Sequence, residues 1–433
     1  MRLGGRLAGA IEVLSDIETR RRPVADALKD WGLSHRFAGS GDRAAIGNIV
    51  YDALRMKLSH AFLMDDDSAH ALGWAVLLRQ WGYTAEQLAS EFDGDNFAPA
   101  PLSEAQARAF ASRNLTDAPP HVQGDIPDWV EPAFETAFGD DWLTEAQALA
   151  TRPTLDLRVN TLKAHRDKVL KALDRANAVA SPIARFGMRV PAGEGPSRLP
   201  NVTAELSFQK GWFEVQDEGS QIVADLVDAR EGDQVLDFCA GGGGKTLAMA
   251  AAMNNKGQVH AYDSDRKRLA PIIERLKRAG THNVQVHDAL KSLSTLKEKF
   301  DRVLVDAPCT GTGTWRRRPD TKWRLTQRNL EERVTQQQDA LTEASAYVKP
   351  GGSLFYVTCS VLPAENDAQV RAFCETNPQF EIVSALEDWK RLFGDKAPKP
   401  PRSADGRTIT LSPASMDTDG FFFCRMRRKT DAV

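Results

Sequence analysis

The chain has 433 residues, a length that predicts two or three domains rather than one core. Hydrophobic residues make up 42% of the chain and charged residues 27%, and no apolar run approaches the ~20 residues that span a bilayer, so we expect a soluble globular chain rather than an integral membrane protein. The net charge of −3 argues against a polycation that coats nucleic acid nonspecifically, so any nucleic-acid contact should be local.

The first 22 residues and the cysteines bear on the compartment. The N-terminal segment has an amphipathic pattern, without the basic segment, apolar stretch and cleavage site of a secretory signal, so we expect a cytoplasmic protein. The cysteines are odd in number and lack C-x-x-C spacing, which argues against a disulfide scaffold or a metal site. We expect reduced thiols at Cys239, Cys309, Cys359, Cys374 and Cys424.

The N-terminal part, residues 1–125, has a helical pattern followed by a linker. Its clearest apolar face has helical spacing and comprises Ile46, Ile49, Val50, Ala53 and Leu54. Residues 93–127 are rich in proline and polar residues, which predicts a linker with at most a short helix around Glu104–Ser112. A small α+β unit is expected over residues 126–206, with a strand at Leu155–Val159 before a helix at His165–Leu173.

The third part, residues 207–433, alternates short strands with helices. The expected strands are rich in β-branched and aromatic residues and lie at 235–238, 259–262, 284–286, 303–305 and 354–357. Between the second and third strands, Leu269, Ile272, Ile273 and Leu276 repeat at helical spacing before a capping Gly280. This alternation predicts a doubly wound parallel sheet, in which ligands bind beyond the carboxyl ends of the strands.

A glycine-rich turn follows the first of these strands and opens a helix; it comprises Cys239, Ala240, Gly241, Gly242, Gly243, Gly244, Lys245 and Thr246. Glycines let the backbone approach a ligand closely, and a helix N-terminus attracts an anionic group. The turn is neither a dinucleotide fingerprint nor a complete P-loop, because Cys239 stands where the P-loop requires glycine. A tight turn without a ligand is the alternative.

Single acidic residues end the next three strands. Asp263 lies about 20 residues beyond the turn, where an acid can accept both ribose hydroxyls of an adenosine, and Asp288 and Asp306 follow the third and fourth strands. Any one of them could instead cap a helix. Together with the glycine turn, the series predicts a pocket for an adenosyl ligand.

Two cysteines are expected at the same rim. Cys309 follows Pro308 after the fourth strand, and Cys359 follows the fifth strand. Cys374 and Cys424 are interpreted as buried packing residues, and Cys239 as packing within the turn.

A thiol at this rim would suit methylation of a pyrimidine. Carbon 5 of cytosine is too weak a nucleophile to take a methyl group from a sulfonium, but a thiolate added at carbon 6 converts the ring to an enamine that can. A proton or hydrogen bond at ring nitrogen 3 assists the addition, and Asp306 is the nearest acid.

These motifs resemble the Sun/Nop-type family of RNA cytosine-5 methyltransferases, and within it the bacterial group that methylates small-subunit ribosomal RNA (methyltransferase B). The resemblance rests on residues 157–161, 215–220, 239–245, 306–309, 358–360 and 419–422. It implies a Rossmann-like S-adenosylmethionine-dependent methyltransferase domain behind an all-helical N-terminal domain and a small RNA-binding unit. It also implies that residues 239–245 with Asp263, Asp288 and Asp306 bind S-adenosylmethionine, that Cys359 attacks the base, and that Cys309 aids product release.

The chain departs from the family at two places. The family turn usually has Ala-Pro where this chain has Gly241-Gly242, which we expect to make the turn more flexible and to weaken cofactor affinity. The N-terminal helices resemble the family's antitermination-factor-like RNA-binding domain chiefly at residues 42–45 and 51–55.

A basic segment after Cys309 is the expected RNA path; it is interleaved with Trp315 and Trp323 and comprises Arg316, Arg317, Arg318, Lys322 and Arg324. A solvated loop is the alternative. The target cytosine would have to be flipped or single-stranded.

Three other functions remain open alongside a monomeric ribosomal RNA methyltransferase. A DNA cytosine-5 methyltransferase would use Cys309 as its nucleophile and would not need Cys359. The RNA substrate could be transfer RNA, or the protein could be a noncatalytic ribosome-assembly factor.

Overall fold

The computed structural model describes residues 1–394 and 401–430, which divide into two compact units. Unit 1 comprises Met1–Pro153, Ala192–Leu199 and Trp315–Leu325. Unit 2 comprises the described residues of Thr154–Pro191, Pro200–Thr314 and Thr326–Val433. The three-part division expected from the sequence stays a prediction.

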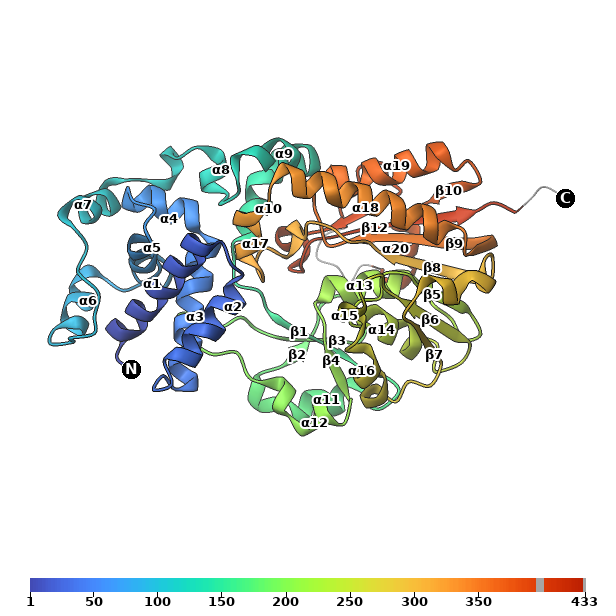
Figure 1. Cartoon of the computed structure of the whole chain (residues 1–433), viewed down its shortest axis with the longest axis horizontal. Helices are drawn as coiled ribbons and strands as arrows, with labels where there is room; N and C mark the ends of the chain where they lie inside the picture. Colours follow the sequence, from blue (N-terminus) through green and yellow to red (C-terminus); the bar gives the residue numbers. More distant parts are fainter. Residues whose placement is uncertain (395–400, 431–433) are drawn as a thin grey trace. The chain divides into compact units, whose positions relative to one another are not determined.

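Unit 1 is helical, and its α1 to α6 are blue in Figure 1. The expected apolar face lies on α3, where Ile46, Ile49, Val50 and Ala53 are fully buried. The short helix α7 has the expected bounds, but the linker also contains α8, because a proline at the first position of a helix costs no hydrogen bond. The helices are α1 (Leu3–Arg20), α2 (Val24–Ser34), α3 (Ser40–Arg55), α4 (Lys57–Met64), α5 (Ala69–Ala75), α6 (Ala85–Phe92), α7 (Glu104–Ser112), α8 (Pro120–Gln123), α9 (Glu131–Phe138), α10 (Trp142–Leu149) and α17 (Pro319–Arg324).

The first part of unit 2 is a small antiparallel sheet with the strand order β2-β3-β1-β4. Its apolar core includes Leu157, Val159, Val169 and Phe213, so the expected strand and the helix that follows it pack together. The elements are β1 (Leu155–Val159), α11 (Arg166–Ala172), β2 (Val179–Ala180), β3 (Gly187–Val190), α12 (Leu206–Gln209), β4 (Phe213–Val215) and α13 (Glu218–Leu226).

The second part of unit 2 is the expected Rossmann-like sheet, with the order β10-β12-β9-β8-β5-β6-β7 and β11 paired to β12. The strands from β9 to β7 run parallel, whereas β10, β11 and β12 are antiparallel additions that the sequence did not indicate. The strands are β5 (Gln234–Asp237), β6 (Gln258–Tyr262), β7 (Val284–His287), β8 (Phe300–Asp306), β9 (Val348–Thr358), β10 (Phe380–Val383), β11 (Ile409–Leu411) and β12 (Phe421–Arg428).

Helices cover this sheet, and α14, α16 and α18 lie close to its strands in Figure 1. Pro271 separates α15 from α16, and Gly280 caps α16 with a φ of 70°, as expected. Ile273, however, is 55% exposed on the outer face of α16. The helices are α14 (Gly244–Ala252), α15 (Arg266–Leu269), α16 (Ile272–Ala279), α18 (Gln327–Ser345), α19 (Asp367–Thr376), α20 (Ala385–Phe393) and α21 (Pro413–Met416). No helix of the described residues is long and apolar enough to cross a membrane.

Candidate active site

The glycine turn joins β5 to α14 and is built from positive backbone angles. Gly241 has a φ of 49° and Gly243 a φ of 82°, values that favour glycine. A Cβ at position 243 would lie 2.4 Å from the Ile272 side chain, so the turn sits directly on α16. Gly242 is also held, because the Arg275 Nη1 donates to its carbonyl oxygen at 2.5 Å.

Asp263 fastens the end of β6 to this turn. Its carboxylate is 3% exposed and accepts from the main-chain N–H of Gly241 and of Asp265, each at 2.8 Å. Asp288 is different, because its side chain is 77% exposed and its Oδ2 lies 3.9 Å from Arg266. The structure therefore brings Asp263, but not the Asp288 carboxylate, to the glycine turn.

Lys245 on α14 pairs with Asp306 at the end of β8, with 2.7 Å between the Nζ and Oδ2 atoms. Burial on its own lowers the pKa of Lys245, but attraction to Asp306, and then to Cys359 and Asp237, outweighs it and raises that pKa above its usual value. Lys245 is therefore a buried cation whose charge acts on Cys359.

Cys309 and Cys359 lie side by side, with their Sγ atoms 3.4 Å apart. Adjacent parallel strands place them there: Asp306 on β8 is in register with Val357 on β9. The hydrogen bond to Cys359 and then burial raise the pKa of Cys309 well above its usual value. Cys309 is therefore held as a thiol next to Cys359.

Glu365 and Gln337, which no sequence motif indicated, fix the backbone on both sides of Cys309. The fully buried Glu365 carboxylate accepts from the N–H (2.8 Å) and hydroxyl (2.5 Å) of Thr310. The Gln337 amide of α18 donates both to Glu365 and to the Pro308 carbonyl, each at 2.9 Å. A glutamate six residues after Cys359 carried no motif that indicated this role.

Asp237 was also missed, although it ends β5 as the other acids end their strands. It is 1% exposed; its Oδ2 accepts from the Thr246 hydroxyl at 2.6 Å, while its Oδ1 has no hydrogen-bond partner among the described residues. Burial, opposed by this hydrogen bond, raises the pKa of Asp237 to about 7. A buried acceptor without a donor is therefore present beside the turn.

The expected RNA path requires a correction at two residues. Arg316 and Lys322 are each 1% exposed inside unit 1. Lys322 donates to the Arg55 carbonyl at 3.0 Å, and burial lowers its pKa to about 8. Both side chains are therefore part of the interior of the helical unit, where the Lys322 ammonium lies 5.8 Å from the centroid of the Trp315 ring.

The other three basic residues are more accessible. Arg317 is half-buried, whereas Arg318 and Arg324 are exposed, and Arg324 pairs with Asp320 at 2.8 Å. Their contact with RNA stays a prediction.

The remaining cysteines pack as interpreted. Cys424 is fully buried in the core of the large sheet, and the partly buried Cys374 and Cys239 lie against it. Burial raises the pKa of Cys239 well above its usual value, which leaves that thiol unreactive.

Comparison with known proteins gives two family matches and curated relatives. The model for 16S rRNA methyltransferase RsmB/F matches residues 224–427, and that for the RsmF/B-like ferredoxin-like domain matches residues 126–190. The ribosomal RNA small subunit methyltransferase B of Cronobacter sakazakii is 34% identical over 70% of this chain, which spans 66% of that relative's length. A probable ribosomal RNA small subunit methyltransferase B of Synechocystis is 31% identical over 71% of this chain and 67% of its own length.

Solved structures share the fold. The crystal structure of PH0851 has a TM-score of 0.74 and 23% identity over 99% of this chain and 100% of its own. NSun6 from Pyrococcus horikoshii, solved with SFG, has a TM-score of 0.60 and 21% identity over 70% of this chain and 99% of its own. A methyltransferase homolog from the same organism has a TM-score of 0.57 and 25% identity over 71% and 97% of the two chains.

Proposed function

Because the chain belongs to the family of 16S rRNA methyltransferases RsmB/F, we propose that it methylates carbon 5 of a cytosine in small-subunit ribosomal RNA, with S-adenosylmethionine as the methyl donor. The observation that carries this proposal is the pair of cysteines, 3.4 Å apart, at the carboxyl ends of β8 and β9. The cytoplasmic location and the monomeric state stay predictions.

The residues of the glycine turn fit this cofactor. S-adenosylmethionine carries an ammonium group and ribose hydroxyls, which are donors, and the buried carboxylates of Asp263 and Asp237 are acceptors beside the turn. Residues 239–245, Asp263 and Asp306 would hold it, whereas the exposed Asp288 would contribute from the rim. When bound, the cofactor supplies an electrophilic methyl group on a sulfonium.

Cys359 is the proposed nucleophile. Its sulfur lies beside the thiol of Cys309, and it interacts electrostatically with the buried ammonium of Lys245. The thiolate forms a bond to carbon 6 of cytosine, and the electron pair of the carbon 5–carbon 6 double bond becomes available at carbon 5. A proton or a hydrogen bond at ring nitrogen 3 assists the addition, and Asp306, paired with the Lys245 ammonium that carries the proton, is the proposed acid–base group there.

Cys309 is proposed to act at release. After carbon 5 has taken the methyl group, its proton must be removed, and that electron pair re-forms the double bond as the bond from Cys359 to carbon 6 breaks. Cys309 is adjacent to Cys359, and its raised pKa, set first by the hydrogen bond to Cys359, keeps it as a thiol. We propose that this thiol gives its proton to the departing sulfur of Cys359 and that the resulting Cys309 thiolate takes the proton from carbon 5.

The test is methyl transfer itself. The protein is incubated with labelled S-adenosylmethionine and either small-subunit ribosomal RNA or transfer RNA, and 5-methylcytosine is mapped in the product. Label at one cytosine of ribosomal RNA is expected. Label only in transfer RNA would show that transfer RNA, not ribosomal RNA, is the substrate. No label in either RNA would favour a noncatalytic ribosome-assembly factor.

A further inference from the structure

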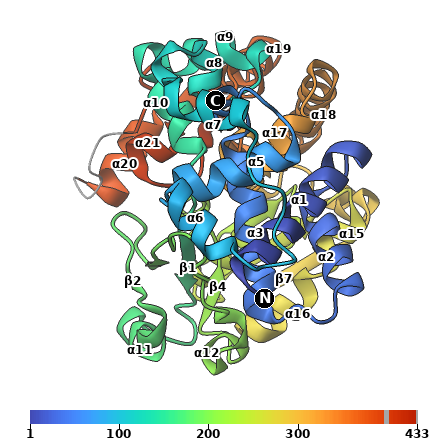
Figure 2. The same ribbon diagram turned by 90° about the vertical axis from the view of Figure 1, so that its left-hand side faces the viewer.

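Unit 2 contains an open groove of about 740 Å³ that is distinct from the cysteine pair. One wall is α12 and the turn after it, the other is the C-terminal half of α16, and these helices lie near β4 in both views (Figures 1 and 2). Its charged lining comprises Lys163, Lys210, Lys277, Arg278 and Glu274.

The groove carries an excess of positive charge. Arg278 pairs with Glu214, with 2.5 Å between Nη2 and Oε1, but the same carboxylate also pairs with Arg275 at 3.0 Å. Lys163 instead donates to the main-chain oxygen of Arg278 at 2.7 Å, and neither Lys210 nor Lys277 makes an ion pair among the described residues. Three lysines therefore face the single carboxylate of Glu274, a net of two positive charges.

Aromatic rings contact two of the basic side chains of the groove, Arg278 and Lys210. The Arg278 guanidinium lies 4.1 Å from the centroid of the Phe208 ring. Trp212, just outside the groove, has the Nζ of Lys168 at 4.1 Å and that of Lys210 at 5.6 Å from its ring centroid. These contacts restrict the cations, so less entropy is lost when a ligand is bound.

The two walls are joined by backbone contacts. The Asn160 amide donates to the carbonyls of Gly211 and Ala279, each at 2.8 Å. Gly211 has a φ of 72°, and a Cβ there would lie 2.0 Å from the Arg278 carbonyl oxygen. The spacing of the two walls is therefore fixed before any ligand binds.

We propose that this groove binds the phosphate backbone of the RNA substrate, away from the cytosine that the cysteines modify. A lysine ammonium is a compact charge without the planar, two-pronged donor geometry of arginine. Several lysines therefore suit a row of phosphates better than a single planar carboxylate. The inference rests on the proposed function for the identity of the anion, and it extends that function by adding a contact that the basic segment after Cys309 does not provide.

The experiment measures RNA affinity against salt concentration for full-length variants. Lys210→Gln combined with Lys277→Gln removes two charges, and Lys297→Gln combined with Lys299→Gln, on the exposed segment before β8, is the matched control. With a single-stranded RNA, log affinity falls as log salt concentration rises, and this fall should be less steep in the groove variant, by about 1.4 in slope. The groove variant should also bind the RNA on the order of 10-fold more weakly at 0.1 M salt. Its KM for RNA should rise while kcat stays unchanged.

The outcomes separate this inference from the proposed function. Equal slopes and equal KM values for the groove variant and its control would contradict the proposal that the groove binds RNA. If the groove variant loses affinity for polyglutamate but not for RNA, the groove takes an acidic protein segment and the inference is wrong. Binding is measured without methyl transfer, so a wild-type protein that binds RNA with the expected slope but transfers no methyl group would overturn the proposed function alone.

Discussion

At the scale of single residues, the position of Cys309 depends on Glu365, which accepts hydrogen bonds from Thr310 and Gln337. Glu365→Gln replaces one acceptor oxygen with a donor that faces other donors, so the loop that carries Cys309 should loosen. We expect turnover to fall on the order of 10- to 100-fold and a covalent protein–RNA species to accumulate.

Steady-state kinetics and denaturing gels check this, with Glu375→Gln on the exposed face of α19 as the control. In a Cys309→Ala background, Glu365→Gln should cause no further loss. An equal additional loss in that background would show that Glu365 does not act through Cys309.

Asp237 makes the stability of the protein depend on pH. Burial raises its pKa to about 7 in the folded protein, from a usual value of 3.8. Because the folded pKa is the higher one, the protonated Asp237 side chain stabilises the folded protein. This stabilisation is fully present below about pH 4 and is lost as the pH rises through about 7.

Asp237→Asn removes this titration and can still accept the Thr246 hydrogen bond. Relative to wild type, the variant should gain stability between about pH 5 and pH 8, as measured by urea unfolding. A difference between the two proteins that stays constant over this range would contradict the prediction.

At the scale of elements, the turn before β4 lies directly against α16 at Gly211. Gly211→Ala places a Cβ at a positive φ, which costs about 1 kcal/mol, and also forces it against the Arg278 carbonyl oxygen. Gly82→Ala is the matched control, because its φ is 73° and nothing lies within 4 Å of a Cβ there. Urea unfolding should show a clearly larger loss in the free energy of unfolding for Gly211→Ala than for Gly82→Ala. Equal losses would show that the Arg278 carbonyl can move aside without a further cost.

The elements themselves were largely predictable. Short runs rich in β-branched and aromatic residues located β5 to β9, and apolar residues at helical spacing located α3 and α16, because local burial controls these patterns. The antiparallel strand β12 was not identified, because its pairing with β9, β10 and β11 depends on residues far away in the chain. The basic segment was misread at Arg316 and Lys322 for the same reason, since tertiary packing decides whether a basic side chain is buried.

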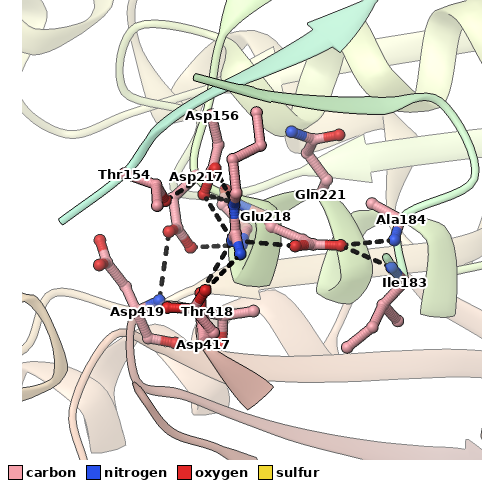
Figure 3. A network of polar contacts seen from close by, with 12 residues as sticks. Thr154, Asp156, Ile183, Ala184, Asp217, Glu218, Gln221, Asp417, Thr418 and Asp419 are labelled. Atoms are coloured by element: carbon pink, nitrogen blue, oxygen red, sulfur yellow. Dashed lines mark hydrogen bonds and ion pairs between the residues drawn. The ribbon is translucent and has the colours of Figure 1, made fainter. Parts of the chain in front are cut away.

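At the scale of unit 2, a buried arginine links its two sheets. Arg189 of β3 contacts Asp156 of β1 at 2.8 Å, Glu218 of α13 at 3.0 Å and Asp417 at 2.7 Å. Figure 3 shows these three acidic residues gathered in one polar network. The segment after Asp417 leads to Gly420, whose N–H donates to the Gly313 carbonyl at 2.8 Å in the loop beyond Cys309.

Arg189→Met should therefore destabilise the protein by about 3–5 kcal/mol, because it leaves buried carboxylates without their cation. Arg189→Lys keeps the charge and should cost less. Urea unfolding at neutral pH compares the two variants, and a fully stable Arg189→Met protein would show that this network does not hold the sheets together.

The active site was predictable where chain order alone places residues at one edge of a parallel sheet. The juxtaposition of Cys309 and Cys359, and that of Asp263 with the glycine turn, follow from this rule. Two other features could not be read from the sequence: the Asp288 side chain is exposed, and Glu365 reaches Thr310 through a tertiary contact. The expected flexibility of Gly241-Gly242 stays a prediction, although Arg275 holds this turn from α16.

The central claim is that Cys359 attacks the base and Cys309 releases the product. The most direct measurement is a denaturing gel of Cys309→Ala, given RNA and S-adenosylmethionine, with Cys359→Ala and the double variant beside it. The account predicts a slow-migrating protein–RNA band in Cys309→Ala that is absent from the other two. A band that instead forms in Cys359→Ala and requires Cys309 would contradict the account and reverse the roles of the two cysteines.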